Sequence, residues 1–285
     1  MRRVAAVIVA VVCGVAGGCG ADDGADTGRN ATGSGVDAAP DAELRGTLER
    51  SRLFAARRAL YLELRDTGDR DVQVGSIQLS SPLFEPVEPE RRDVLVRAGA
   101  PPRAMPLPYG AVRCDAEPEG QAELITDVDG EEVRIPLDEN PSGILAEIHA
   151  DECVVAEVLA DVELRFGDRW QRTGPRAVAG ELEVRQRRPG VRAVVEDVEG
   201  NVIFALRTGD EVARGLEVDD DRPSATTRVE IDASRCDPHA LIEYKRTFIL
   251  PAWVRVGDGD PVRVDVEVEG AARRALDELL ALCLD

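Results

Sequence analysis

Cysteine is the residue type whose number and spacing most constrain the chemistry of this chain. Six cysteines are present, and no two of them form the CxxC pair typical of a zinc site. If the chain is exported, its thiols can form disulfides in an oxidising compartment. If the chain were cleaved before Cys19, the mature protein would contain five cysteines. A modification of the Cys19 thiol would then leave four free thiols, which can pair completely as two disulfides. These four are Cys114, Cys153, Cys236 and Cys283.

The two histidines do not form a recognisable catalytic group. His149 lies in the sequence IHADEC, where a helix could turn several ligands toward one metal ion, but a surface helix has the same pattern. His239 precedes an apolar stretch, as at a turn or a strand entry, and neither histidine has a serine or thiol at a spacing that suggests a nucleophile. No phosphate loop, nucleophile elbow or HExxH motif is present. We therefore expect no catalytic residue, no cofactor, no metal site and no enzymatic activity.

Acidic residues gather in four short clusters that could hold calcium, which binds roughly six to eight oxygen ligands. None of the clusters reproduces the EF-hand loop, so solvated turns are the favoured interpretation. Three adjacent carboxylates at Asp219–Asp221 repel one another unless something neutralises them, which makes this cluster the first to test. The other three clusters are Asp66 with Asp69, Asp127 with Asp129, and Asp258 with Asp260.

The charge balance narrows the range of partners. The chain has 35 basic and 55 acidic residues, a net charge of −20 at pH 7. Nucleic acid and anionic lipid headgroups require clustered positive charge, so neither is expected to bind. Aromatic residues make up only 4% of the chain, so its cores must be built mainly from Val, Leu, Ile and Ala.

The first residues have the features of an export signal. Arg2 and Arg3 precede a short apolar run from Val4 to Val12. That run is too short to be a good membrane span, which needs about 20 residues. Small residues then lead to Cys19.

This segment resembles the signal peptide and lipobox of a bacterial lipoprotein. The resemblance implies a signal peptide over residues 1–18 and acyl chains on Cys19 that hold the protein to the extracytoplasmic face of a cell membrane. Ala16 stands where the lipobox favours Leu. Cleavage without lipidation, which would give a secreted protein, is therefore the alternative.

The rest of the chain divides by composition. Residues 19–44 comprise the lipidated cysteine and a tether of Gly, Ala, Asp, Ser and Thr, which cannot bury a core and should be disordered. After it we expect a first β domain over residues 45–170, a linker over 171–179 and a second β domain over 180–285. A chain of this length is also expected to contain about two domains.

The two expected domains share an order of landmarks, which predicts an internal duplication. Each match is weak because the residue types are common, and the shared order carries the argument. Residues 154–179 have no evident partner, and we interpret Val154–Trp170 as an added strand pair that closes the first domain. The matched landmarks are Gly46, Leu48, Glu49, Arg58, Ala59 and Leu60 with Gly180, Leu182, Glu183, Arg192, Ala193 and Val194; Arg113–Asp115 with Arg235–Asp237; and Val133–Ile135 with Val262–Val264.

Each copy alternates apolar and polar residues, as in Val262–Val268, in the manner of half-buried strands. Turn residues at Asp129–Gly130, Glu199–Asn201 and Gly257–Asp260 predict hairpins. A helix is expected over Ala271–Cys283, where the leucines share one face. The pattern predicts a mainly β fold of two tandem antiparallel β-sandwich (Ig-like) domains, each with a short helix near its C-terminal end and one disulfide.

Four cysteines allow three connectivities, and their spacing alone does not choose among them. If each copy folds by itself, the bridges are Cys114–Cys153 and Cys236–Cys283. On the chain-entropy model, closing loops of 39 and 47 residues would stabilise each domain by roughly 4 kcal/mol.

The segment Arg235–Pro251, RCDPHALIEYKRTFILP, resembles a stretch of uncharacterised actinobacterial lipoproteins. The likeness covers mainly the second copy and the lipobox, and it implies no activity and no functional residue. The first copy departs from it after Asp115. A site built by this segment would therefore exist only in the second domain.

Together these features predict a membrane-anchored extracytoplasmic lipoprotein that acts as a binding or interaction module for an envelope protein or glycan. Such binding needs loops and sheet edges rather than a catalytic group. Two alternatives stay open. One is a hydrolase of envelope polymers with paired carboxylates about 5 to 9 Å apart in a deep cleft, and the other is a calcium-dependent adhesive module.

Overall fold

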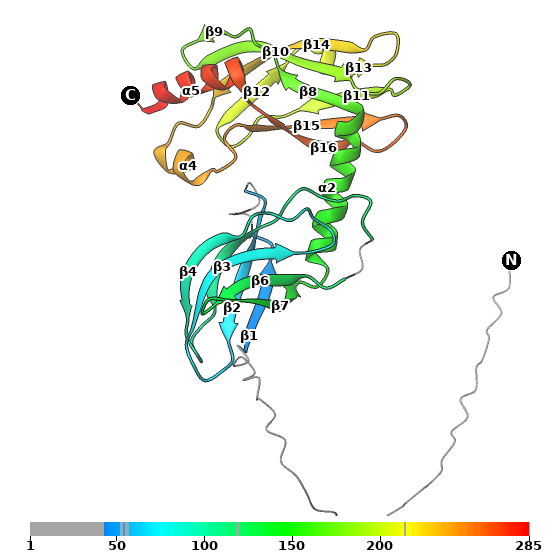
Figure 1. Cartoon of the computed structure of the whole chain (residues 1–285). Coiled ribbons are helices and arrows are strands. Elements are labelled where there is room, and N and C mark those ends of the chain that lie inside the picture. Colours follow the sequence, from blue (N-terminus) through cyan, green and yellow to red (C-terminus); the bar gives the residue numbers. More distant parts are fainter. Residues whose placement is uncertain (1–42, 52–53, 55–56, 118–119, 214, 285) are drawn as a thin grey trace, which may run out of the picture. The chain divides into compact units, whose positions relative to one another are not determined.

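The structure, a computed structural model, describes residues 43–284 with gaps at 52–53, 55–56, 118–119 and 214 (Figure 1). The expected signal peptide, the lipidated Cys19 and the tether up to residue 42 lie outside the described residues, and these expectations stay predictions. The described part is mainly β, as expected, and contains two hydrophobic cores.

We refer to residues 44–161 as the first copy and to residues 162–284 as the second copy. The first copy comprises β1 (Leu44–Glu49), β2 (Ala59–Asp66), β3 (Val72–Ser80), β4 (Glu90–Val96), β5 (Arg103–Pro108), β6 (Glu123–Val128), β7 (Glu131–Asn140) and α2 (Ile144–Asp161). The second copy comprises β8 (Val162–Phe166), β9 (Gln171–Gly174), β10 (Ala177–Gln186), β11 (Ala193–Val198), β12 (Phe204–Thr208), α3 (Asp210–Ala213), β13 (Leu216–Val218), β14 (Ser224–Ala233), α4 (Pro238–Glu243), β15 (Ile249–Val256), β16 (Val262–Glu267) and α5 (Gly270–Leu284).

The strands of the first copy form two groups joined by β7. Their order is β4-β3-β6-β7-β1-β2-β5, in which the first part of β7 pairs with β6 and the segment Leu137–Asn140 pairs with β1. Side chains of both groups, such as Leu62 and Leu124, lie in one core, so the groups face each other as the sheets of a sandwich. In immunoglobulin letters these sheets are A-B-E and C′-C-F-G. The expected Ig-like sandwich is thus confirmed; its strand pairs are antiparallel except for β1 with β7, which pair in parallel.

The second copy has the same arrangement in two separate sheets. One sheet has the order β12-β14-β10-β8, with β9 also paired to β10, and the other has the order β13-β11-β15-β16. Strand β12 lies beside β14, which corresponds to strand E, and so takes the place of strand D in an immunoglobulin sheet. Unlike strand D, it precedes β13, the counterpart of C′, along the chain. Side chains of both sheets, such as Leu182 and Val254, fill one core.

The pairing registers show which strands of the two copies correspond. In the first copy Leu48 of β1 pairs with Leu62 of β2, and in the second Phe166 of β8 pairs with Leu182 of β10. Strands β10 and β14 then pair as β2 and β5 do, and β13-β11-β15-β16 pair as β4-β3-β6-β7 do. Even the β-bulge of β3 recurs in β11. The structure therefore shows two copies of one topology.

This register corrects the first set of sequence landmarks. Gly46 lies in β1 and Gly180 in β10, and these two strands do not correspond. Leu62 and Leu182 are equivalent positions of the two copies. The position equivalent to Gly180 is Leu60, because Leu60 stands two residues before Leu62 and Gly180 two residues before Leu182. The error arose because the pattern Gly-x-Leu-Glu, where x is any residue, occurs in both strands.

The second set of landmarks agrees with the register. The backbone N–H of Arg113 donates to the carbonyl of Leu83 at 2.9 Å, and that of Arg235 donates to the carbonyl of Ile203 at 3.2 Å. In the third set, Ile135 of β7 and Val264 of β16 are both buried at 4% exposure or less. These two sets therefore mark equivalent places in the two copies.

The segment between the copies differs from the prediction. The strand pair expected over Val154–Trp170 is wrong, because residues up to Asp161 belong to helix α2 and β8 pairs with β10 of the second copy. The linker expected over 171–179 is also wrong, since it contains β9 and the start of β10. Strand β8 is the first strand of the second copy and follows α2 directly.

Helix α2 closes the first copy as α5 closes the second. Ile144, Leu145 and Ile148 of α2 pack in the first core, whereas Val158 packs in the second. The carboxylate of Glu139 accepts a hydrogen bond from the N–H of Leu145 at 3.0 Å, which satisfies a donor of the first helical turn. The expected helix over Ala271–Cys283 is confirmed as α5.

The expected turns are confirmed at two of three places. Asp129–Gly130 connects β6 to β7, and Gly257–Asp260 lies between β15 and β16. Glu199–Asn201 is not a hairpin, because it leads from β11 in one sheet to β12 in the other.

The disulfides follow the duplication. Cys114 and Cys153 are bonded, with their Cα atoms 5.4 Å apart, and this bridge ties the β5–β6 loop to α2. Cys236, at the equivalent place after β14, is also disulfide-bonded. Its expected partner Cys283 is in α5, but the side chain of Cys283 lies outside the described residues, so that pairing stays a prediction.

Candidate functional site

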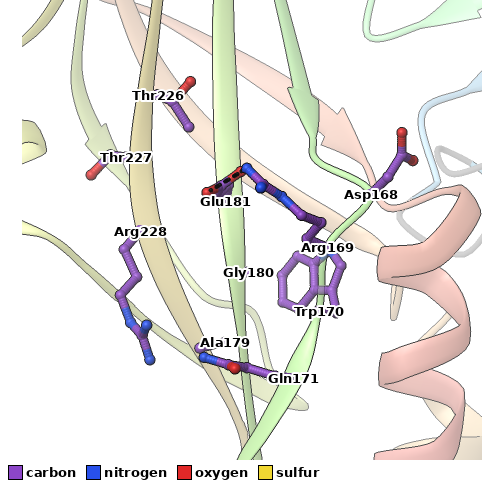
Figure 2. Close-up of a pocket in the computed structure, with 10 residues that line it drawn as sticks. All are labelled: Asp168, Arg169, Trp170, Gln171, Ala179, Gly180, Glu181, Thr226, Thr227 and Arg228. Carbon is purple, nitrogen blue, oxygen red and sulfur yellow. Dashed lines mark hydrogen bonds and ion pairs between the residues drawn. The ribbon is translucent and has the colours of Figure 1, made fainter.

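An open pocket of about 660 Å³ lies on the second copy, and we refer to it as the Trp170 pocket. Figure 2 shows its lining, which comes from the segment between β8 and β9, from the first residue of β9 and from the strands β10 and β14. The residues that line it are Asp168, Arg169, Trp170, Gln171, Ala179, Gly180, Glu181, Thr226, Thr227 and Arg228.

The pocket exists because the first strand of the second copy is interrupted. Strand β8 pairs with β10 up to the Phe166–Leu182 pair, and pairing resumes only where Gln171 meets Ala179. The N–H of Gly167 still donates to the carbonyl of Glu181 at 2.8 Å, and the three residues 168–170 then leave the sheet. This interruption opens a gap beside β10 at Gly180.

The indole of Trp170 fills that gap. A Cβ atom placed on Gly180 would lie 2.4 Å from the Trp170 ring, so only glycine lets the ring approach β10 this closely. The indole N–H donates to the carbonyl of Gly167 at 2.7 Å, and the Phe166 ring lies edge-on with its centroid 6.1 Å away. The ring is therefore held in one orientation on the core-facing side of β10, where it packs against the second core.

The charged and polar side chains of the pocket on β9, β10 and β14 lie on the other face of the sheet, which points outward. Arg169 reaches across β10 and donates to Glu181 at 3.1 Å (Figure 2). The side chains of Gln171 and Arg228 are exposed, and neither makes a hydrogen bond or ion pair with another residue that the structure describes. The pKa of Glu230 is lowered mainly by its hydrogen bond from Arg207 and also by the positive charge of Arg228.

The first copy fills the equivalent position differently. Leu60, which corresponds to Gly180, is only 1% exposed and packs its own side chain into the first core. Among the residues that the structure describes, the Trp170 pocket is thus a feature of the second copy.

The histidines singled out in the sequence do not lie in this pocket. The Nε2 atom of His149 lies 3.0 Å from the carbonyl oxygen of Arg113, and its ring meets Phe84 edge-on beside the Cys114–Cys153 bridge. His239 is largely exposed on α4, with Nε2 3.2 Å from Glu243. These contacts of both histidines fit a structural role.

Hydrogen bonds stabilise the charges of two carboxylates in the cluster at Asp219–Asp221. Asp219 accepts from the backbone N–H groups of Asp221 and Arg222 at 3.0 and 2.8 Å. Asp220 accepts from the N–H of Gly190 at 2.7 Å and from the amide of Gln186, and the Gly190 bond is the main cause that lowers the pKa of Asp220. These carboxylates therefore stabilise their own turn.

Two of the other three acidic clusters also hold loops together. Asp66 is 2% exposed, and one of its oxygens accepts from the N–H of Gly68 at 2.8 Å. Asp127 accepts from Gly130, and Asp129 pairs with Arg70 at 3.1 Å, while Asp258 and Asp260 are exposed in the β15–β16 turn. In the described ranges, no three His, Cys, Asp or Glu side chains gather as metal ligands would.

A polar network in the first copy was not anticipated. Glu152 of α2 accepts from Arg58 at 2.7 Å and from the hydroxyl of Tyr109 at 3.1 Å. Burial and then the negative charge of Glu152 raise the pKa of Tyr109 to about 12. The network fastens α2 to the end of β5, near the disulfide.

A sequence signal for the Trp170 pocket existed. Glycine inside a strand pattern often marks a close approach of another group, and Gly180 stands in the run AVAGELEV of β10. The chain has only two tryptophans, so Trp170, ten residues before that glycine, was the natural candidate for the group.

Comparison with known proteins adds little to this picture. No protein-family model matches the chain, and no curated protein matches it. One solved structure that is similar is a protein of unknown function from Porphyromonas gingivalis W83, at 16% identity over 80% of this chain and 99% of that one. Its TM-score of 0.19 does not establish a common fold.

The fold and the pocket define the class of this chain as a tandem Ig-like β-sandwich protein with an open polar pocket on its second copy. Within the described residues, no helix is long and apolar enough to cross a membrane.

Proposed function

We propose that this protein is a lipid-anchored lipoprotein on the extracytoplasmic face of a bacterial cell membrane, where its two Ig-like copies bind an envelope protein or glycan. The anchor is the lipobox-like segment that ends at Cys19, and no enzymatic activity is part of the proposal. The segment Arg235–Pro251, which resembles uncharacterised actinobacterial lipoproteins, is consistent with this class.

The observation that carries the proposal is the state of the cysteines. Cys114, Cys153 and Cys236 are all disulfide-bonded, and such bonds persist in oxidising compartments outside the cytoplasm. A mature chain that begins at Cys19 has one cysteine more than the four that the two copies can use. Acylation of Cys19 explains the odd thiol.

The fold supports the binding role. Ig-like sandwiches present loops and sheet edges on a rigid frame, and binding residues commonly lie there. The Trp170 pocket is such a place, since it lies beside the interrupted edge of a sheet. No observation among the described residues favours the hydrolase or the calcium module.

The anchor is tested with the full chain in an actinobacterial host supplied with an alkyne-tagged fatty acid. We expect the tag on the wild-type protein and its recovery with membranes. Cys19→Ser should lose the tag and leave the membrane fraction, whereas Cys13→Ser should behave as the wild type. A wild-type protein that is untagged and found in the medium would show that the chain is secreted.

The binding role is tested with the exported Cys19→Ser chain, which keeps every described residue. Immobilised chain should retain a component of a purified envelope fraction, and heat-denatured chain should not. Equal retention by both would contradict the binding role.

A further inference from the structure

We propose that the Cys114–Cys153 bridge is a thiol–disulfide exchange site, at which an external dithiol attacks Cys114 and the imidazole of His149 stabilises Cys153 as it leaves. This inference goes beyond the proposed binding role and depends on neither the anchor nor a ligand. It concerns the first copy only.

The two cysteines of the bridge differ in accessibility. Cys114 is exposed in the loop between β5 and β6, whereas Cys153 is half-buried on α2. A thiolate that attacks a disulfide needs access to the sulfur that it attacks, and the other sulfur is the leaving group. The exposed loop therefore favours attack on Cys114 and departure of Cys153.

His149 lies beside the leaving sulfur. It precedes Cys153 by four residues, so both side chains lie on one face of α2, and its Nε2 atom is 3.7 Å from Sγ of Cys153. The same Nε2 lies 3.0 Å from the carbonyl oxygen of Arg113. Because a carbonyl only accepts hydrogen bonds, this contact keeps a hydrogen on Nε2, the atom that faces the sulfur.

The imidazole is held in this place from two sides. The carbonyl of Arg113 accepts its N–H, and the ring of Phe84, which is buried, meets the imidazole edge-on with the centroids 6.4 Å apart. A hydrogen-bond donor beside a sulfur stabilises its thiolate, and a more stable thiolate leaves faster. The donor is therefore in place before the S–S bond breaks.

The exchange is balanced in atoms and electrons. The thiolate of the dithiol forms a bond to Sγ of Cys114, the Cys114–Cys153 bond breaks, and its electron pair stays on Sγ of Cys153. This new thiolate accepts a hydrogen bond from Nε2 of His149 and then takes a proton from water. The second thiol of the reagent loses its proton and attacks the mixed disulfide, which releases Cys114 as a thiolate that is protonated in turn. The bridge is thus reduced to two thiols, and the dithiol is oxidised to a disulfide.

Reduction does not require the first copy to unfold. Helix α2 keeps its buried face in the first core, and Glu152 still accepts hydrogen bonds from Arg58 and Tyr109. These contacts include neither sulfur of the bridge. The bridge can therefore open in the folded copy and be formed again by the reverse reaction.

The second copy provides the matched comparison. The position equivalent to His149 is Leu279 of α5, four residues before Cys283, and Leu279 is 0% exposed in the second core. Cys236 is half-buried rather than exposed. The bridge of Cys236 therefore has neither an exposed cysteine at this place nor a histidine at the equivalent position of the closing helix.

The test is the rate at which dithiothreitol reduces each bridge in the exported Cys19→Ser chain, without denaturant and at one fixed pH. Samples are quenched with iodoacetamide, and mass spectrometry identifies the alkylated cysteines. We expect Cys114 and Cys153 to be alkylated before Cys236. When glutathione replaces dithiothreitol, the mixed disulfide should lie on Cys114 and the alkyl group on Cys153.

Variants at position 149 separate a chemical role from a structural one. His149→Leu, which copies the second copy, should slow reduction of the first bridge about tenfold, because the leaving thiolate loses a hydrogen bond. His149→Gln keeps an N–H donor and should recover most of the rate. Loss of packing alone would open the copy more often and speed reduction, so destabilisation does not mimic the slower rate. The control is His239→Leu, which removes the exposed histidine of α4 and should leave the rate unchanged.

Four results would overturn the inference: reduction of the Cys236 bridge first, a glutathione adduct on Cys153 instead of Cys114, a His149→Leu chain that is reduced as fast as the wild type, or a His149→Gln chain that is as slow as His149→Leu. None of these measurements uses the lipid anchor or a bound envelope component. A failed exchange test therefore leaves the proposed function as it stands, and a failed anchor or binding test leaves the exchange site.

Discussion

The two copies share one topology and differ most where the chain enters the first sheet. In the first copy β1 is a continuous strand beside β2, and Leu60 fills the core with its own side chain. In the second copy the entering strand is split into β8 and β9, and Trp170 takes the space above Gly180. One scaffold can therefore keep its core while the strand at the edge of a sheet is interrupted to form a pocket.

The copies also differ in the segment after Cys114 in the first copy and after Cys236 in the second. The first copy passes from Cys114 to β6, whereas the second inserts helix α4 after Cys236. Asp237 caps α4 by accepting from the N–H of Ala240 at 2.8 Å, which stabilises a helix start.

The largest expected effect comes from the bridge of the first copy. Replacing both Cys114 and Cys153 by Ser opens a loop with a sequence separation of 39 and should destabilise the first copy by about 4 kcal/mol. Both tryptophans, Trp170 and Trp253, are in the second copy. In thermal unfolding, circular dichroism should therefore show a new early transition, while tryptophan fluorescence keeps its wild-type midpoint. An equal shift of both signals would show that the copies unfold as one unit.

A smaller effect tests the proposed correspondence of core positions. Leu62 and Leu182 are both 0% exposed at equivalent places in their sheets. Each change to Ala should cost about 3 kcal/mol, because it removes buried methyl groups and leaves a cavity. Urea unfolding should show the tryptophan signal shifted by Leu182→Ala and unshifted by Leu62→Ala. If Leu62→Ala moved the tryptophan transition as far, the two cores would not be energetically separate.

Sequence reasoning predicted the repeated core well because that core follows strand alternation. The landmarks around Arg113 and Val133 and the helix α5 were placed correctly, since the apolar periodicity of these segments is the same in both copies. The boundary between the copies was missed because Gly46 and Gly180 look alike in sequence, and only the pairing register shows that they lie in different strands. The pocket was missed because a gap in a strand depends on which strand lies beside it.

The next prediction concerns the close contact that makes the pocket. Gly180→Ala puts a methyl group where the Trp170 ring lies, and a rigid ring cannot yield as a flexible side chain would. We expect a loss of about 1 to 3 kcal/mol from overpacking and a changed tryptophan emission spectrum. Gly174→Ala is the control, because its new Cβ would meet Ala177 at an ordinary 3.4 Å. An unchanged spectrum in Gly180→Ala would mean that the indole does not rest on this glycine in solution.

The smallest expected effect concerns a group that only the first copy has. Tyr109 corresponds to Ile231, so its hydroxyl bond to Glu152 has no counterpart in the second copy. Tyr109→Phe should cost about 1 kcal/mol at pH 7, the typical net value of one hydrogen bond.

The pH dependence of that difference follows from the raised pKa of Tyr109. An unfolded tyrosine ionises near pH 10, whereas the folded state holds Tyr109 protonated until about pH 12. Above pH 10 the unfolded state therefore binds fewer protons than the folded state, and the contribution of Tyr109 to stability falls as the pH rises. The contribution is complete below about pH 10 and is lost as the pH passes about 12. Urea unfolding of wild type and Tyr109→Phe between pH 7 and pH 12, with Tyr244→Phe as the control, should show the two stabilities converging only for the Tyr109 variant. A difference that stayed constant over this range would mean that the Tyr109 hydroxyl is not held against Glu152.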